Sequence, residues 1–180
     1  MIAPPAMGVR RYWADLPARV RSAVEDIPGA RVVEARGQDG GFSPGVAARV
    51  RLADGRRAFV KAVSAATNPH SPDPHSPDLH RAEAGHTAAL PPGAPVPALL
   101  GSYDDGTVVA LVFQDIDGRQ PRVPWDPAEL ERVLAAVDEL GPAPTPAPFA
   151  APAVAVAAAE AFSRWRKLLA AGDPGGLDAA

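Results

Sequence analysis

The sequence predicts an α+β domain in which an antiparallel sheet carries one inserted helix. Along residues 46–52 apolar side chains alternate with others, as they do in a strand with one buried face. Asp-Gly pairs at 54–55 and 105–106 each join two strand-like runs, and this dipeptide is a strong signal for a tight hairpin. A helix-like stretch lies between the two hairpins, so the class is α+β and not all-β.

The composition limits the kinds of protein this chain can be. Its 180 residues suffice for one domain, or for a small domain and part of another. The absence of cysteine excludes disulfides and thiolate metal sites, and a net charge of −3 argues against a general nucleic-acid binder. No apolar run approaches the ~20 residues that span a bilayer, and the first residues do not resemble a signal peptide. We therefore expect a soluble, cytoplasmic protein with no membrane or nucleic-acid partner.

Local patterns place the first elements. Apolar residues at three- and four-residue steps predict an amphipathic helix over residues 15–27, with Asp15 as its cap and Pro28-Gly29 as its end. A meander of three antiparallel strands follows it. Its strands are expected over residues 31–36, 46–52 and 57–63. In the third of these strands, Lys61 shares a face with Phe59 and Val63.

A loop and a helix are expected to separate the third strand from the fourth. The loop, residues 64–78, contains the imperfect repeat HSPDP–HSPDL. Its neighbourhood includes three histidines, which we interpret as solvated loop residues because zinc sites need converging ligands. They are His70, His75 and His80. Asp78 is expected to cap a helix that runs to Leu90. Apolar runs over residues 95–102 and 107–113 then complete a five-stranded sheet.

The rest of the chain is expected to be helical between polar connectors. Residues 114–124 are polar and irregular, and apolar positions predict a helix over 126–140. A proline-rich linker leads to a last predicted helix, over about 154–171. Four large apolar residues share one face of that helix and are expected to form an exposed patch: Phe162, Trp165, Leu168 and Leu169.

A glycine-rich turn and a lysine are the residues that could carry chemistry. The turn, Gly40-Gly41-Phe42-Ser43-Pro44-Gly45, would let backbone N–H groups approach phosphate oxygens, or it could be a bulged hairpin. It is not a Walker-type loop. Lys61 needs an anionic partner if its face of the strand is covered, and Glu83 on the following helix could supply one. The alternatives are an edge-strand lysine that reaches solvent and a helix-surface glutamate.

In this order the parts resemble the N-terminal lobe of the aminoglycoside phosphotransferase family, a branch of the protein-kinase-like fold. The resemblance covers about residues 30–140. It implies that the glycine loop covers the nucleotide phosphates, while Lys61 holds the α- and β-phosphates and pairs with Glu83. The loop positions concerned are Gly40, Gly41, Ser43 and Gly45. The hinge between the lobes would cradle adenine through its backbone. Its residues include Phe113, Gln114, Asp115 and Ile116.

The resemblance also implies domains, cofactors and a reaction. Residues 1–30 would be an N-terminal extension with a helix, 31–113 the kinase-like lobe, 114–124 the hinge and 125–180 part of a helical second lobe. The family transfers phosphate from ATP, with Mg²⁺, to a hydroxyl of a small-molecule acceptor that this sequence does not identify.

The chain departs from the family in two places. Phe42 stands at the middle position of the loop, where protein kinases have glycine. A loop of the HxDxxxxN type should follow the hinge, yet no histidine occurs after Gly118. We therefore expect no catalytic residue and no Mg²⁺ ligand in this chain. Three readings remain: the ATP-binding portion of a phosphotransferase, a non-catalytic nucleotide-binding or interaction module, and a truncated product without activity.

Overall fold

The computed structural model describes residues 10–38, 45–66, 75–119, 121–122, 124–140, 156 and 159. The loop residues Gly40, Gly41 and Ser43 lie outside the described residues, and so does the expected apolar patch of the last helix. Residues 156 and 159, within the expected span of that helix, are helical. The chain divides into two compact units, Met1–Pro148 and Phe149–Ala180. The elements below belong to the first unit.

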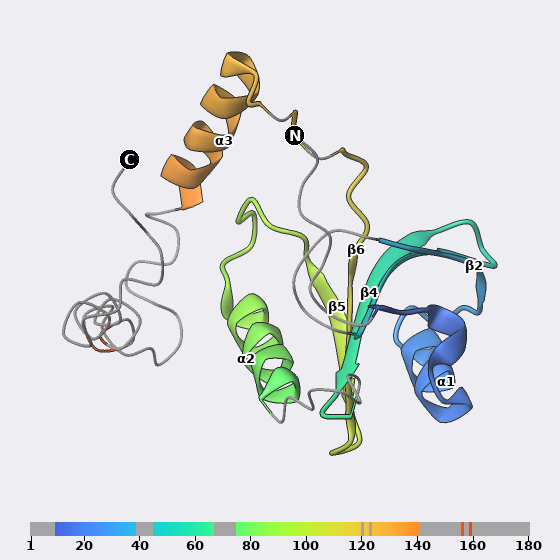
Figure 1. Cartoon of the computed structure of the whole chain (residues 1–180). Coiled ribbons are helices and arrows are strands. Elements are labelled where there is room, and N and C mark those ends of the chain that lie inside the picture. The colour runs from blue at the N-terminus through green and yellow to red at the C-terminus, as the bar shows by residue number, and fades with distance from the viewer. Residues whose placement is uncertain are drawn as a thin grey trace, which may run out of the picture. The chain divides into compact units, whose positions relative to one another are not determined.

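Five antiparallel strands form the sheet, in the order β2–β3–β4–β6–β5 (Figure 1). They are β2 (Val32–Gly37), β3 (Gly45–Leu52), β4 (Arg57–Ser64), β5 (Leu99–Asp104) and β6 (Val108–Gln114). A two-residue strand, β1 (Arg10–Arg11), runs parallel to the first residues of β3. The α+β class and the five-stranded antiparallel sheet expected from the sequence are confirmed.

Both Asp-Gly hairpins are confirmed, and both depend on a glycine with positive φ. Gly55 joins β3 to β4 with a φ of 87°, and Gly106 joins β5 to β6 with a φ of 82°. The preceding aspartates stabilise the turns by accepting backbone hydrogen bonds. Asp54 accepts one from the N–H of Arg56 at 3.0 Å, and Asp105 accepts one from the N–H of Val108 at 2.7 Å.

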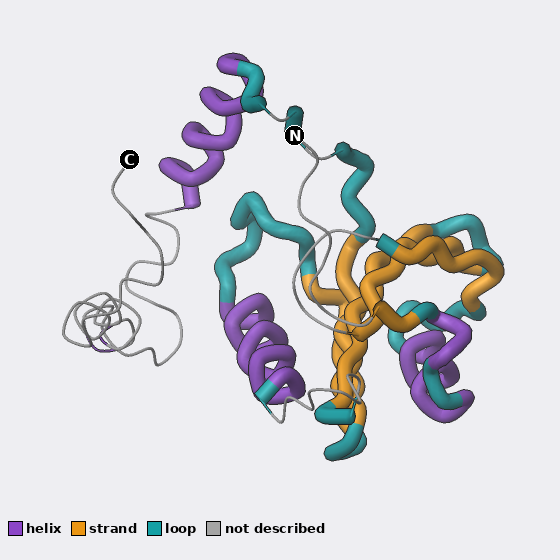
Figure 2. The backbone as a smooth tube through the Cα atoms, viewed as in Figure 1, coloured by secondary structure: helices purple, strands orange, loops and turns teal. Residues whose placement is uncertain are grey.

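The helices α1 (Ala18–Asp26) and α2 (Ser76–Ala89) cover opposite faces of the sheet (Figure 2). On the α1 side, Val20 and Val24 join the buried side chains of β3, β4 and β6 in one apolar cluster. On the α2 side, the buried cluster consists of Val109, Leu111 and Phe113 of β6. All of residues 108–113 are buried, because successive side chains of β6 point to opposite faces and both faces are covered.

The alternation predicted for β3 and β4 is observed. The buried side chains of β3 are at most 4% exposed, and they are Val46, Ala48, Val50 and Leu52. In β4, Ala58, Val60 and Ala62 are buried toward the same cluster. Lys61 therefore lies on the opposite face of the sheet, with α2.

The first helix begins later than the sequence indicated. Trp13–Asp15 form a short 3-10 turn, and α1 starts only at Ala18. The expectation that Asp15 caps α1 was wrong, because its carboxylate accepts a hydrogen bond from the N–H of Tyr12 at 2.7 Å. The reason is Pro17, since a residue before proline avoids helical angles, and Leu16 is extended with ψ at 139°.

The second helix begins earlier than the sequence indicated. It starts at Ser76, and Asp78 lies in its first turn, where it pairs with Arg81 at 2.8 Å. Pro77 fits the first turn because its missing N–H would have no partner there. His80 is consequently helical and only 5% exposed, so the interpretation of His80 as a solvated loop residue was wrong.

The third helix, α3, spans Pro127–Leu140, one residue shorter than expected. The side chain of Asp126 accepts hydrogen bonds from the N–H groups of Ala128 and Glu129 at 3.0 and 3.2 Å, so it acts as the cap. The apolar side chains of α3 are 39–57% exposed, and they are Leu130, Val133, Leu134 and Val137. No helix in the described part of the chain has the length and apolar character that a membrane crossing requires.

We expect Gly45→Ala to lower the free energy of unfolding by about 3 kcal/mol. Gly45 has a φ of 107°, and a Cβ there would lie 2.3 Å from the carbonyl oxygen of Ala62 in β4. Urea unfolding measures the loss. Gly55→Ala is the control, because its φ is 87° but no atom lies within 4 Å of the added Cβ. Gly55→Ala should lower the free energy of unfolding by only about 1 kcal/mol. Equal losses at the two sites would contradict the close approach of β4 to Gly45.

Candidate functional site

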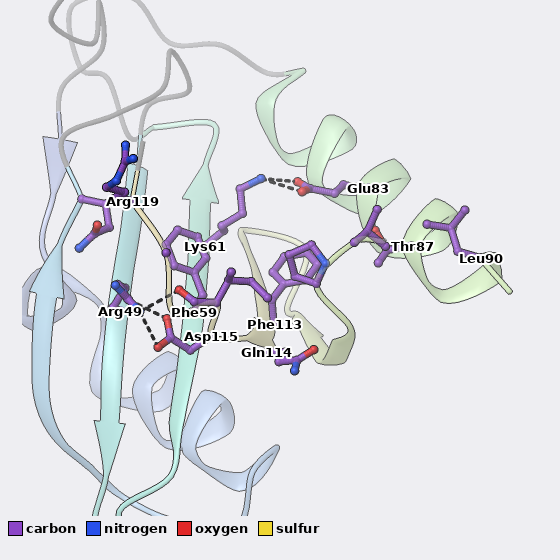
Figure 3. A pocket seen from close by; sticks show the side chains of 15 residues that line it. Arg49, Phe59, Lys61, Glu83, Thr87, Leu90, Phe113, Gln114, Asp115 and Arg119 are labelled. Carbon is purple, nitrogen blue, oxygen red and sulfur yellow. Dashed lines mark hydrogen bonds and ion pairs between the residues drawn. The ribbon is translucent and has the colours of Figure 1, made fainter. Parts of the chain in front are cut away.

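A cleft of about 800 Å³ opens on the α2 side of the sheet (Figure 3). It is lined by residues of β3, β4, β6 and α2, and by the segments that precede β5 and follow β6. Six residues singled out from the sequence line it together: Lys61, Glu83, Phe113, Gln114, Asp115 and Ile116. Gly45 is not among the lining residues, and its observed role is the close packing against Ala62.

Lys61 and Glu83 form an ion pair at this cleft, as the sequence predicted. The Nζ of Lys61 lies 2.7 Å from each carboxylate oxygen of Glu83. Both side chains are about one-third exposed, at 30% and 36%, so each charge is partly desolvated and accessible to a ligand. Nζ also lies 6.0 Å from the centre of the Phe113 ring, at the outer limit of a cation–π contact.

Aromatic and aliphatic side chains form the wall beside this ion pair. Phe59 of β4 and Phe113 of β6 are cross-strand partners, and both line the cleft. Leu90, Val96 and Pro97 contribute further apolar surface. A few polar groups beside an apolar wall are typical of small-molecule sites.

Arg49 and Asp115 form a second ion pair at the cleft, which the sequence did not reveal. Arg49 donates two hydrogen bonds to the Asp115 carboxylate, from Nε at 2.7 Å and from Nη2 at 2.9 Å. This carboxylate raises the pKa of Arg49. Nη2 also donates to the carbonyl oxygen of Ile116 at 2.8 Å. The side chain of Asp115 is 4% exposed, so the pair fixes the segment after β6 to β3.

Arg119 connects the end of this segment to α3. It lines the cleft and forms an ion pair with Glu129, whose carboxylate also accepts a hydrogen bond from the N–H of Arg122 at 2.8 Å. The hydrogen bond from Arg122 and the pairing with Arg119 lower the pKa of Glu129. Neither Arg119 nor Glu129 carried a sequence signal, because each reads as an ordinary surface charge.

His80 lies buried in α2, and its titration responds to both charges of the Lys61–Glu83 pair. Its Nδ1 is 3.0 Å from the carbonyl oxygen of Ser76. Burial lowers the pKa of His80, the hydrogen bond to Ser76 opposes this, and the charges of Lys61 and Glu83 act in opposite directions. The imidazole is therefore neutral at pH 7.

Comparisons of the chain with protein-family models, with curated proteins and with solved structures find no match. Within the described residues, no group of three or more His, Cys, Asp or Glu side chains could hold a metal ion.

A double-mutant cycle on Lys61→Met and Glu83→Gln should give a coupling energy of about 1–2 kcal/mol. This lies between the values for exposed and buried pairs, because both side chains are about one-third exposed. Urea unfolding of the wild type, the two single variants and the double variant measures it. A coupling near zero would mean that solvent screens the pair and that it does not hold α2 to β4.

The free energy of unfolding should decline as the pH falls below about 6.5, the pKa of an unfolded histidine. The folded protein resists protonation of buried His80, so the unfolded chain binds more protons in this range. One extra proton bound by the unfolded chain changes the free energy of unfolding by at most about 1.4 kcal/mol per pH unit. His80→Gln should flatten this dependence between pH 7.5 and pH 5. The same slope in His80→Gln as in the wild type would contradict the assignment.

Proposed function

We propose that the cleft binds ATP in a nucleotide-binding lobe of the protein-kinase-like fold. The observation that carries the proposal is the Lys61–Glu83 pair, with Nζ 2.7 Å from both carboxylate oxygens, at the side of an apolar cleft. Lys61 stands on the third strand of a five-stranded antiparallel sheet, and Glu83 stands on the helix that follows this strand. Kinase-fold proteins place their phosphate-binding lysine and its glutamate on the same two elements.

The geometry supports a phosphate at Lys61. An ammonium group is a compact charge with three donors, and it binds phosphate oxygens as a point charge. Glu83 keeps the flexible lysine side chain oriented, because its two oxygens engage Nζ before a ligand arrives. A side chain held in place loses less conformational entropy on binding, so the pair is preorganised for an anionic ligand.

The cleft also suits a base. Its volume of about 800 Å³ lies within the range of small-molecule sites, and Phe59 and Phe113 provide flat surfaces beside Lys61. The Arg49–Asp115 pair fixes the backbone of residues 115 and 116 along the same cleft. A fixed peptide segment can recognise a base through its N–H and C=O groups without paying an ordering cost.

Binding, and not catalysis, is the activity proposed for these residues. Mg²⁺ needs oxygen ligands, and the phosphates of ATP supply several of them. The sequence after Gly118 has no histidine and hence no HxDxxxxN motif. Phosphoryl transfer to a hydroxyl acceptor is the reaction that the family resemblance implies. A non-catalytic nucleotide-binding module is the alternative.

We expect millimolar MgATP to raise the melting temperature of this chain, and isothermal titration calorimetry to give a weak dissociation constant. At a ligand concentration ten times the dissociation constant, the stabilisation is about 1.4 kcal/mol. Lys61→Ala should weaken binding about tenfold or more, because it removes the cation that meets the phosphates. No stabilisation by MgATP in the wild type would contradict the proposal.

Arg81→Gln is the matched control. Like Lys61, Arg81 forms an ion pair, here with Asp104 at 2.7 Å. It belongs to α2, but it does not line the cleft. Its variant should bind MgATP as the wild type does. An equal loss in both variants would mean that Lys61 acts only by holding α2 in place. Turnover of ATP with a hydroxylated acceptor, abolished by Lys61→Ala, would extend the proposal from binding to catalysis.

A further inference from the structure

Four arginines gather on the sheet at a second hollow, of about 250 Å³, beside the cleft. They are Arg36 of β2, Arg49 and Arg51 of β3 and Arg57 of β4, and we call them the arginine face. Arg49 and Asp115 line both the hollow and the cleft, whereas Lys61 lines only the cleft. The hollow is therefore adjacent to the proposed ATP site but is built from other residues.

The strand register places these arginines against one another. Arg36 is the cross-strand partner of Arg49, and Arg51 is the cross-strand partner of Arg57. Like charges directly opposite each other on antiparallel strands are destabilising. Two such pairs on three adjacent strands lower the stability of the sheet. The fold itself does not require arginine at these positions, because these side chains lie on the partly exposed face of the strands.

The carboxylates at the hollow offset only part of this charge. Glu34 pairs with Arg36 at 2.7 Å and with Arg51 at 3.0 Å, and Asp115 pairs with Arg49 at 2.7 Å and Arg57 at 3.3 Å. Asp117 is a third carboxylate near the hollow, 3.7 Å from Arg57 and 4.0 Å from Arg49. Four cations and three carboxylates therefore leave one positive charge in excess.

The arginines also keep hydrogen-bond donors for a ligand. Among the described residues, Arg36 and Arg51 each donate through Nε alone, to the two oxygens of Glu34. Their terminal NH₂ groups remain available, and the two side chains are 77% and 52% exposed. Glu34 thus holds two guanidinium groups side by side, which is an arrangement that suits a tetrahedral dianion with several acceptor oxygens.

We propose that the arginine face binds a phosphate dianion, either free or as the terminal phosphate of a small ester. The excess positive charge attracts an anion, and the oxygens of a phosphate can accept hydrogen bonds from both arginines that share Glu34. The inference does not depend on nucleotide binding in the cleft, because Lys61 takes no part in it.

Isothermal titration calorimetry with inorganic phosphate, and separately with glycerol phosphate, tests the proposal at constant ionic strength set with sodium chloride. We expect saturable binding that Arg36→Gln and Arg51→Gln each weaken about tenfold. If both probes bind, the site takes the phosphate of an ester, and if only inorganic phosphate binds, it takes the free ion.

Two control variants make the outcome decisive. Arg56→Gln removes an arginine of similar exposure, 59%, that pairs with Asp54 at the turn between β3 and β4, and it should leave phosphate binding unchanged. Arg81→Gln, on α2 and outside the hollow, should also leave it unchanged. Urea unfolding without phosphate verifies that each variant is folded. Absence of saturable binding, or equal weakening by Arg51→Gln and Arg56→Gln, would overturn the proposal.

Discussion

A lysine on the covered face of a sheet constrains how this fold is assembled. Lys61 stands between Phe59 and Val63 on the side of β4 that faces α2, where an unpaired ammonium would be costly. Glu83 meets that need only if α2 lies across the sheet in one register, so the ion pair and the position of the helix determine each other. The cleft beside them follows from the same constraint, because α2 stands over β4 and β6 at the point where the charges meet.

The two faces of the sheet are held in different ways. Among the described residues, the apolar cluster under α1 contains twelve buried side chains, while the cluster under α2 contains three. α2 is instead attached by ion pairs, Lys61–Glu83 to β4 and Arg81–Asp104 to β5. Partly exposed ion pairs contribute less stability than apolar burial does. The side of the sheet that carries the cleft is thus the one with less buried apolar contact, as ligand-binding parts of proteins commonly are.

The sequence was informative where a periodic pattern reports a local structure. Alternation along residues 46–52 predicted β3, because a half-buried strand repeats every two residues, and the Asp-Gly pairs predicted both hairpins. Helix starts were predicted less well. At α1, Pro17 restricts Leu16 to extended angles, and at α2, Pro77 is compatible with the first turn and so allows an earlier start.

The charges of the site show the limit of such reasoning. Lys61 and Glu83 were paired in advance from the order of the motifs, since one residue lies on a strand and the other on the next helix. Arg49 and Asp115 are 66 positions apart, and each reads as an ordinary surface charge in its own segment. Nothing local in the sequence indicates that Asp115 is buried, because its burial results from β3 and β6 lying on either side of β4. The packing of Gly45 against the backbone of Ala62 likewise has no signal in the local sequence.

The hydrogen bond of His80 gives the site a spectroscopic label of its own. A carbonyl oxygen can only accept, so in the contact with Ser76 the hydrogen resides on Nδ1, and the neutral ring is the Nδ1–H tautomer. That tautomer has a ¹⁵N chemical-shift pattern distinct from the usual form of a solvated histidine. Because the charges of Lys61 and Glu83 both act on this ring, its resonances will report any rearrangement of the pair without an added probe.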